Sequence, residues 1–149
     1  MSRLRVSVDL DATPRQVWNV VEDIGSHVEW MNDAVAIRFV SSKRKGVGAT
    51  FECDTKVGPF SLVDVMEVVE WKPGRAMGIR HVGLVTGTGR FTLSKRRWRG
   101  RGGTRFTWTE KLSFPWWMGG PIGGLFAKPI LRHVWRGNLR NLKRIVDGV

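Results

Sequence analysis

His81 and Glu110 are the residues of this chain whose types best suit acid–base chemistry. Glu110 follows Trp108 by two residues, and a carboxyl group on an apolar wall can act as a general base if desolvation keeps it protonatable near neutral pH. His81 can pass a proton to a carbonyl oxygen of a bound substrate. Together they would suit an aldol-type cyclisation followed by dehydration. The other polar side chains that can reach an apolar interior are Asp64, Asn138, Thr55 and Thr92.

A purely structural role for the same two residues is the alternative. Glu110 can pair with one of the many arginines, such as Arg90 or Arg105, and His81 precedes Gly83 at the end of a strand. A lone histidine and a lone glutamate are structural more often than catalytic. The sequence therefore favours a binding protein over an enzyme.

Other kinds of reaction centre are not expected. The serines stand outside a Gly-x-Ser-x-Gly frame, which argues against a hydrolase. Neither Gly87-Thr88-Gly89 nor the glycine-rich segment 119–124 has the strand, spacing and lysine of a nucleotide-binding loop. The three histidines, at positions 27, 81 and 133, have no second ligand at helical or hairpin spacing, so we expect no metal site and no cofactor.

The strand that carries Glu110 must place it on an inner face. Alternation over residues 104–113 puts an apolar set and one carboxylate on one side, and mostly charged or hydroxyl side chains on the other. We assign the first side to the interior. By the same alternation, the inner positions of this and neighbouring strands are Phe51, Cys53, Thr55, Met77, Ile79, His81, Phe91, Leu93, Thr104, Phe106, Trp108, Glu110 and Leu112.

The N-terminal segment predicts a strand followed directly by a helix. Apolar residues alternate with polar ones up to Leu10. Thr13 can then cap a helix, with Pro14 at its first position and Gln16 completing a capping box. Gly25 breaks this helix before a second short helical turn.

A sheet is predicted between this helix pair and a final helix. Short segments of strand character run over residues 34–41, 49–57, 60–71, 76–82, 85–95 and 104–113, with turns at glycine and proline, including one at 100–103. Short connections imply antiparallel neighbours. Residues 122–146 form an amphipathic helix, apolar on one side and rich in arginine on the other. We expect Pro129 to kink or delay it, leaving 122–128 as a separate turn or a lid.

This arrangement resembles the helix-grip fold of the START-like superfamily, particularly the bacterial polyketide cyclase/dehydrase and lipid-transport proteins. The resemblance covers nearly the whole chain and is carried by Ala12-Thr13-Pro14, Val17-Trp18, Asp23, Trp30, Gly48-Ala49-Thr50-Phe51, Glu70-Trp71-Lys72-Pro73 and Gly103-Thr104-Arg105-Phe106-Thr107-Trp108. It implies a single α+β domain over residues 1–149, in which a seven-stranded curved antiparallel sheet wraps a long C-terminal helix. It also implies an apolar ligand cavity between sheet and helix, but not its occupant.

Trp116 and Trp117 stand in an unusual loop, because two adjacent side chains of an extended segment cannot both point inward. With Met118 and the surrounding glycines they can form a lid over the cavity mouth, or an anchor at a bilayer surface. Close packing over the start of the last helix is the third possibility.

The formal net charge is +12, with 25 lysines and arginines against 13 acidic residues. A basic hairpin over residues 95–105 has the ingredients of nucleic-acid contact, but it is short and no nucleic-acid-binding module accompanies it. We therefore do not expect nucleic acid as a partner, whereas an anionic membrane surface stays an open alternative. The chain has a single cysteine, no apolar run of membrane-spanning length and no leader pattern, so we expect a cytoplasmic protein, with peripheral membrane attachment left open.

The leading hypothesis is binding of a small hydrophobic, lipid-like or polycyclic ligand, with its transport left open. A polyketide-type cyclase or dehydratase using the same pocket is the first alternative, with His81 and Glu110 as catalytic residues, and surface binding of nucleic acid or membrane is the second. The sequence leaves the oligomeric state undetermined. The predicted ligand contacts are Phe51, Cys53, Met77, Ile79, His81, Phe91, Phe106, Trp108, Glu110, Leu131, Val134, Trp135 and Asn138.

Overall fold

A computed structural model describes residues 2–98 and 101–148. Seven antiparallel strands form one sheet in the order β1-β7-β6-β5-β4-β3-β2. The strands are β1 (Ser2–Leu10), β2 (Ala34–Phe39), β3 (Thr50–Val57), β4 (Phe60–Lys72), β5 (Ala76–Val82), β6 (Thr86–Trp98) and β7 (Arg101–Ser113). The helices are α1 (Pro14–Val21), η1 (Ile24–Glu29), η2 (Trp116–Met118) and α2 (Gly120–Asp147), of which η1 and η2 are 3₁₀-helices.

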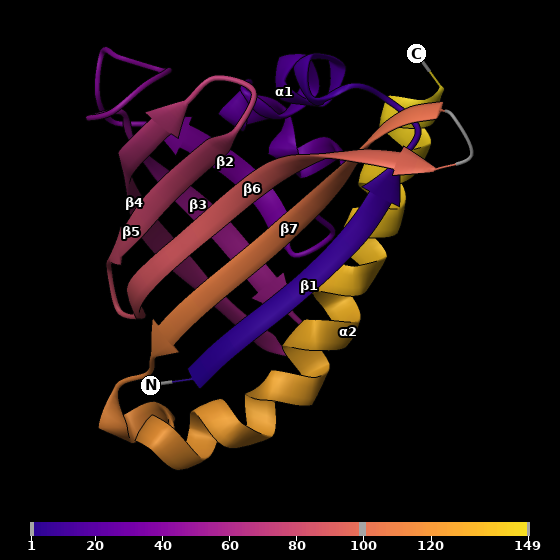
Figure 1. Cartoon of the computed structure of the whole chain (residues 1–149). Helices are drawn as coiled ribbons and strands as arrows, with labels where there is room; N and C mark the ends of the chain where they lie inside the picture. Colours follow the sequence, from indigo (N-terminus) through magenta and orange to yellow (C-terminus); the bar gives the residue numbers. More distant parts are fainter. Residues whose placement is uncertain (1, 99–100, 149) are drawn as a thin grey trace.

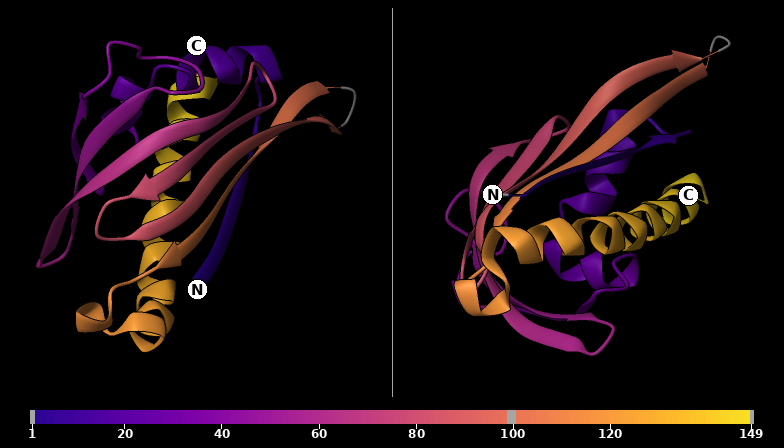
Figure 2. Two further views of the ribbon diagram at one scale, coloured as in Figure 1. Left: turned by 90° about the vertical axis from the view of Figure 1, so that its left-hand side faces the viewer. Right: turned by 90° about the horizontal axis from the view of Figure 1, so that it is seen from below.

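The sheet curls and α2 runs along its concave side, while η1 packs against β2 and α1 packs against α2, β6 and β7 (Figures 1 and 2). This is the predicted helix-grip architecture. The concave side carries the core, because inner positions of β1, β6 and β7 meet the apolar side of α2. The buried apolar residues of α2 in this core include Trp135, Leu139, Leu142 and Val146.

The start of α1 confirms the predicted capping box. The Thr13 hydroxyl accepts a hydrogen bond from the Gln16 backbone N–H, and the Gln16 side chain accepts one from the Thr13 backbone N–H. Val17, Trp18 and Val21 form its buried side. The local sequence thus determines both where this helix begins and which side packs.

Two boundaries differ from the prediction. Part of the expected turn at 100–103 is strand, since Gly102 and Gly103 pair in register with Arg97 and Arg96 as part of β7, while residue 100 lies outside the described residues. Position 103 of this strand favours glycine, because a Cβ there would lie only 2.8 Å from the Leu10 carbonyl oxygen. At the C-terminus, α2 is one helix from Gly120 onward rather than a turn followed by a helix, and it contains Pro129.

Pro129 is accommodated by curvature. The ribbon of α2 changes direction between its first turns and the remainder (Figure 1). A proline inside a helix removes one backbone hydrogen bond and crowds the preceding turn, which bends the helix without ending it. Segment 122–128 is therefore part of α2 and not a separate element.

Candidate functional site

A buried polar cluster lies on the concave side of the sheet. His81 Nε2 is 2.7 Å from Glu110 Oε2, and His81 Nδ1 is 2.9 Å from Asp64 Oδ2. The Trp108 indole donates a hydrogen bond of 3.0 Å to Glu110 Oε1. His81 and Glu110 are each 6% exposed, so nearly all of this cluster is shielded from water.

The structure thus brings together His81 and Glu110, which the sequence singled out. Their proposed arginine partners are engaged elsewhere: Arg90 pairs with Glu70, and Arg105 pairs with Asp9. The alternative in which an arginine neutralises Glu110 is therefore wrong for Arg90 and Arg105. Their side chains extend from the opposite side of the sheet, as alternation along the strands requires.

Glycines on β6 make room for the cluster. β6 lies between the strands of His81 and Glu110, and its Gly89 is paired with Glu110. A Cβ on Gly89 would lie 2.5 Å from Glu110 Oε1, which no real side chain tolerates. On Gly87, it would lie 1.8 Å from the Lys111 carbonyl oxygen. Because β6 has no side chain at Gly89, the Glu110 carboxylate can cross this strand and reach His81.

The charge on His81 follows from its two partners. Burial by itself would lower the pKa of the imidazole, but the hydrogen bonds and charges of Asp64 and Glu110 outweigh burial and raise its pKa to about 10. At neutral pH His81 is therefore an imidazolium that donates a hydrogen bond to each carboxylate. This arrangement can hold a proton at a fixed place in an apolar wall.

Asp64 is the member of the cluster that the sequence did not assign to the site. It was one of several polar candidates, but only the register of β4 and β5, in which Met66 is paired with His81, shows that it reaches His81 Nδ1. The role of Gly89 in the site is not predicted by the sequence pattern, because Gly87-Thr88-Gly89 resembles only an incomplete phosphate-binding loop. The available signal was the alternation of glycine along a strand, which leaves one side without side chains.

The predicted ligand-binding wall has a close-packed part. Phe91, Phe106, Trp108 and Trp135 are all nearly buried and contact one another, with Trp108 and Trp135 stacked at 4.6 Å between ring centroids. Phe51 and Met77 are also buried. This aromatic packing stabilises the grip of the sheet on α2.

A second part of the wall is less tightly covered. Ile79, Leu131 and Val134 are only half-buried although they belong to the edge of the core, and Leu62 and Met66 share this property. Ile79 is two residues from His81 on the same side of β5. Ile79 and Met66, which is paired with His81, therefore place half-buried apolar surface next to the polar cluster.

Asn138 and Cys53 have local partners. The Asn138 amide donates to Asp33 Oδ1 at 2.7 Å and accepts from the Asn32 backbone N–H at 2.9 Å, so it fastens α2 to the segment after η1. Cys53 is buried, as expected, and burial raises the pKa of its thiol to about 11, which leaves it protonated. A ligand contact by either residue stays a prediction.

The predicted lid residues lie in and beside η2. Trp116 is 87% exposed and Trp117 is 58% exposed, so neither indole is packed into the core. The Met118 side chain lies outside the described part of the structure. Both tryptophans are available at the surface, whether as a lid or as an anchor.

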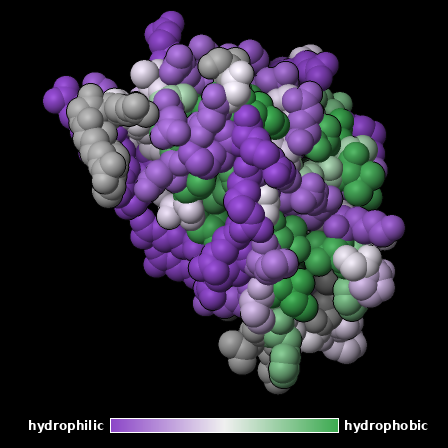
Figure 3. Space-filling model, turned by 90° about the vertical axis from the view of Figure 1, so that its right-hand side faces the viewer, coloured by the Kyte–Doolittle hydropathy of each residue, from purple (hydrophilic) through white to green (hydrophobic). Residues whose placement is uncertain are grey.

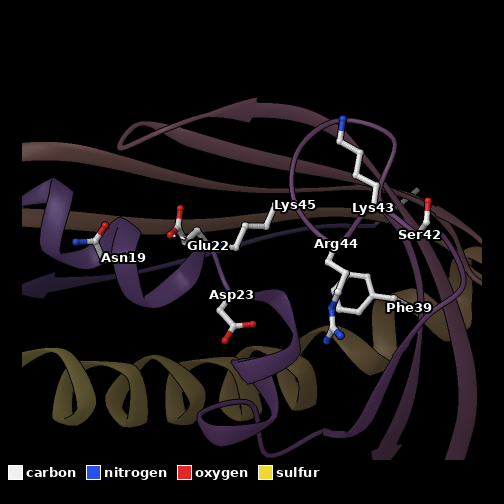
Figure 4. A pocket seen from close by; sticks show the side chains of 8 residues that line it. All are labelled: Asn19, Glu22, Asp23, Phe39, Ser42, Lys43, Arg44 and Lys45. Atoms are coloured by element: carbon white, nitrogen blue, oxygen red, sulfur yellow. Dashed lines mark hydrogen bonds and ion pairs between the residues drawn. The ribbon is translucent and has the colours of Figure 1, made fainter.

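A hollow of about 790 Å³ lies between α1 and the loop after β2, away from the polar cluster (Figure 4). Seven of its eight lining residues are polar or charged, the exception being Phe39. A second, smaller hollow lies beside Asn141. Neither is lined by a predicted ligand contact, and their polar linings do not suit an apolar ligand.

No metal centre is formed by the described residues. They contain no group of three histidine, cysteine, aspartate or glutamate side chains arranged to hold an ion. Both nitrogens of His81 are already engaged by carboxylates.

The sequence profile of one family, described as "Polyketide cyclase / dehydrase and lipid transport", matches residues 1–147. The chain belongs to this family. Among curated proteins it is 31% identical over 147 residues to uncharacterized protein Rv2574 of Mycobacterium tuberculosis strain H37Rv, covering 96% of this chain and 83% of that protein. A protein of Mycobacterium bovis, uncharacterized protein Mb2604, shows the same identity and coverage.

Several solved structures share the fold of this family member. XoxI from Bacillus cereus gives a TM-score of 0.74 at 12% identity, covering 98% of this chain and 96% of that one. TTHA0849 from Thermus thermophilus gives a TM-score of 0.73 at 14% identity, covering 97% and 96%. These likenesses confirm the helix-grip architecture. The described helices include none that is long and apolar enough to cross a membrane.

Proposed function

We propose that this family member binds a small hydrophobic ligand between the sheet and α2, with a polar group of the ligand directed at the His81 cluster. The observation that carries the proposal is the buried hydrogen-bonded set of His81, Asp64 and Glu110 in an otherwise apolar wall. Buried charge is costly in a purely structural core, where apolar residues of similar volume usually serve as well. Charged groups in an apolar site can hold a bound ligand in one orientation, which is a function that a purely apolar core cannot supply.

The surroundings of the cluster support an apolar ligand. Ile79 and Met66 present half-buried apolar surface beside it, and burying such surface contributes about 25 cal/mol per Å². The N–H groups of His81 are used by Asp64 and Glu110, whereas each oxygen of the Glu110 carboxylate can accept a further hydrogen bond from a polar substituent of the ligand. A lipid-like or polycyclic molecule with one polar end would place its apolar part against these side chains and its polar end at the cluster.

A cyclase or dehydratase is the second candidate, and one specific observation favours it. His81 links two carboxylates, so a proton can be held on the imidazole or passed to a carboxylate or ligand oxygen without water. Such a cluster can remove a proton next to a carbonyl group through Glu110 and return one to an oxygen through His81. Both steps are needed for aldol-type ring closure and loss of water.

Binding is tested with 1-aminoanthracene, a neutral polycyclic probe that fluoresces more strongly in apolar surroundings. The wild-type protein is expected to bind it saturably, with one site per chain. Ile79→Trp places a larger side chain beside the cluster and is expected to reduce affinity at least tenfold. Val63→Trp is the matched control, since Val63 is 43% exposed and lies next to Asp64 on the opposite side of β4. Equal loss in both variants, or none in either, would overturn the proposed site.

The enzymatic alternative has its own test. 1-Phenyl-1,3-butanedione carries acidic protons between two carbonyl groups, and their exchange with deuterated water is followed by proton NMR. If Glu110 is a base toward bound ligands, the wild-type protein accelerates exchange and Glu110→Gln abolishes the acceleration while the probe still binds. Acceleration that Glu110→Gln leaves unchanged contradicts the acid–base role and leaves binding alone.

A further inference from the structure

Four large apolar side chains are exposed together where β7 leads into α2. We call them the tryptophan edge: Trp116 and Trp117 of η2, and Phe126 and Ile130 of α2. They are 87%, 58%, 73% and 56% exposed. η2 packs against α2, so the four belong to one end of the molecule (Figure 1). Exposed aromatic side chains in such number on one end indicate a contact surface, not a random scatter.

Two hairpin turns extend this apolar end. Thr86, at the start of β6, is paired with both Val82 and Ser113, so the β5–β6 turn lies beside the residues that precede η2. Leu84 in that turn is 54% exposed, and Phe60, at the start of β4, is 71% exposed. Because Met66 is paired with His81 and the strands are antiparallel, the Phe60 turn projects from the same end of the sheet.

The segment of the chain that carries the tryptophan edge has charges of one sign. Residues 111–146 contain no aspartate or glutamate, and they contain Lys111, Lys128, Arg132, Arg136, Arg140, Lys143 and Arg144. Arg136 and Arg140 are exposed on later turns of the same helix. Figure 3, which faces the side where α2 lies, shows hydrophobic atoms emerging among hydrophilic ones. The surface thus combines an apolar tip with a basic flank.

We propose that the tryptophan edge docks on the surface of an anionic lipid bilayer. Indole rings favour the boundary between headgroups and acyl chains, where the ring is apolar and its N–H stays hydrated. Arginines beside them meet the phosphates, and each basic side chain near an anionic surface strengthens binding about fivefold. Apolar tips with a flank of one charge are the pattern of peripheral membrane binding.

This surface does not depend on the proposed ligand site. The tryptophan edge faces outward from η2 and α2, whereas the His81 cluster lies on the inner side of β4, β5 and β7. A protein that fails to bind 1-aminoanthracene can still dock on vesicles, and the reverse also holds.

The test is co-sedimentation of the full chain with vesicles of phosphatidylcholine alone, or of phosphatidylcholine mixed with phosphatidylglycerol. Wild-type protein is expected to sediment with the anionic vesicles and to release at high salt. Trp116→Ser combined with Trp117→Ser is expected to lower the affinity at least tenfold, since two large apolar side chains lose their burial. Arg136→Gln combined with Arg140→Gln is expected to lower it about 25-fold, and only for anionic vesicles.

Matched controls separate docking from general charge and folding. Arg15→Gln combined with Arg75→Gln removes two exposed charges from α1 and from the turn before β5, away from η2, and is expected to retain most of the affinity. Far-ultraviolet circular dichroism checks that each variant folds. Sedimentation of the tryptophan double variant equal to wild type overturns the proposal. So does failure of the wild type to bind anionic vesicles, including the case where the exposed tryptophans mediate a dimer detected by light scattering.

Discussion

His81 and Glu110 are joined by a 2.7 Å hydrogen bond although a complete strand, β6, lies between the strands that carry them. The contact is possible because the inner position of β6 at this level is Gly89. The His81 and Glu110 side chains can therefore meet above the backbone of β6, where no side chain separates them. The geometry of the site depends on an absent side chain as much as on the polar ones.

Glu110→Gln should lower the pKa of His81. The substitution removes one of two carboxylates that hold the imidazolium, and an opposite charge at this distance accounts for about 1–3 pKa units. The pKa is measured by NMR titration of histidine side-chain resonances. An unchanged His81 pKa would show that Glu110 does not act on the imidazole.

Gly89→Ala should also lower the pKa of His81, although it alters no ionisable group. The added methyl group would occupy the position of the Glu110 carboxylate, so Glu110 must turn away from His81 and the His81 pKa falls. The crowding should also lower the free energy of unfolding by about 1–3 kcal/mol. Gly102→Ala is the control, since a Cβ there meets nothing within 4 Å. If both variants leave the His81 pKa at its wild-type value, Gly89 has no positioning role.

Much of this architecture was readable in the sequence because local signals and hydrophobic alternation agree. The capping residues Thr13 and Gln16 and the alternating side chains of β7 determined both elements and their inward sides. The connection of Asp64 to His81 was not readable, because it depends on the register between β4 and β5. The continuity of α2 through Pro129 was also missed, since the packing of the following turns offsets the local tendency to break.

Because the pKa of His81 is raised in the folded state, the free energy of unfolding should depend on pH above neutrality. A group that binds its proton more tightly in the folded state stabilises fully below its unfolded pKa of 6.5, and this contribution is lost as pH rises toward about 10. The free energy of unfolding of wild type relative to His81→Gln should therefore fall between these values, by up to about 1.4 kcal/mol per pH unit. Urea unfolding at a series of pH values measures it.

His27 should act in the opposite direction at acid pH. Burial lowers its pKa to about 4, against the smaller effect of its 2.7 Å hydrogen bond to the Val21 carbonyl. Its neutral form is favoured in the folded state, so the contribution is present above pH 6.5 and is lost as pH falls to about 4. His27→Phe should flatten this acid-side decline relative to wild type. A decline of equal steepness in the variant would assign acid sensitivity to other groups.

The three histidines provide the most direct test of the ligand site, since His81 lies in the cluster, His27 is buried beside Trp30 and His133 is exposed on α2. The measurement is a titration of histidine-labelled protein with 1-aminoanthracene, followed through the imidazole resonances. The proposed site predicts saturable shifts of the His81 resonances with those of His133 unchanged. Saturable binding that leaves His81 unaffected, or that shifts only His133, would contradict it.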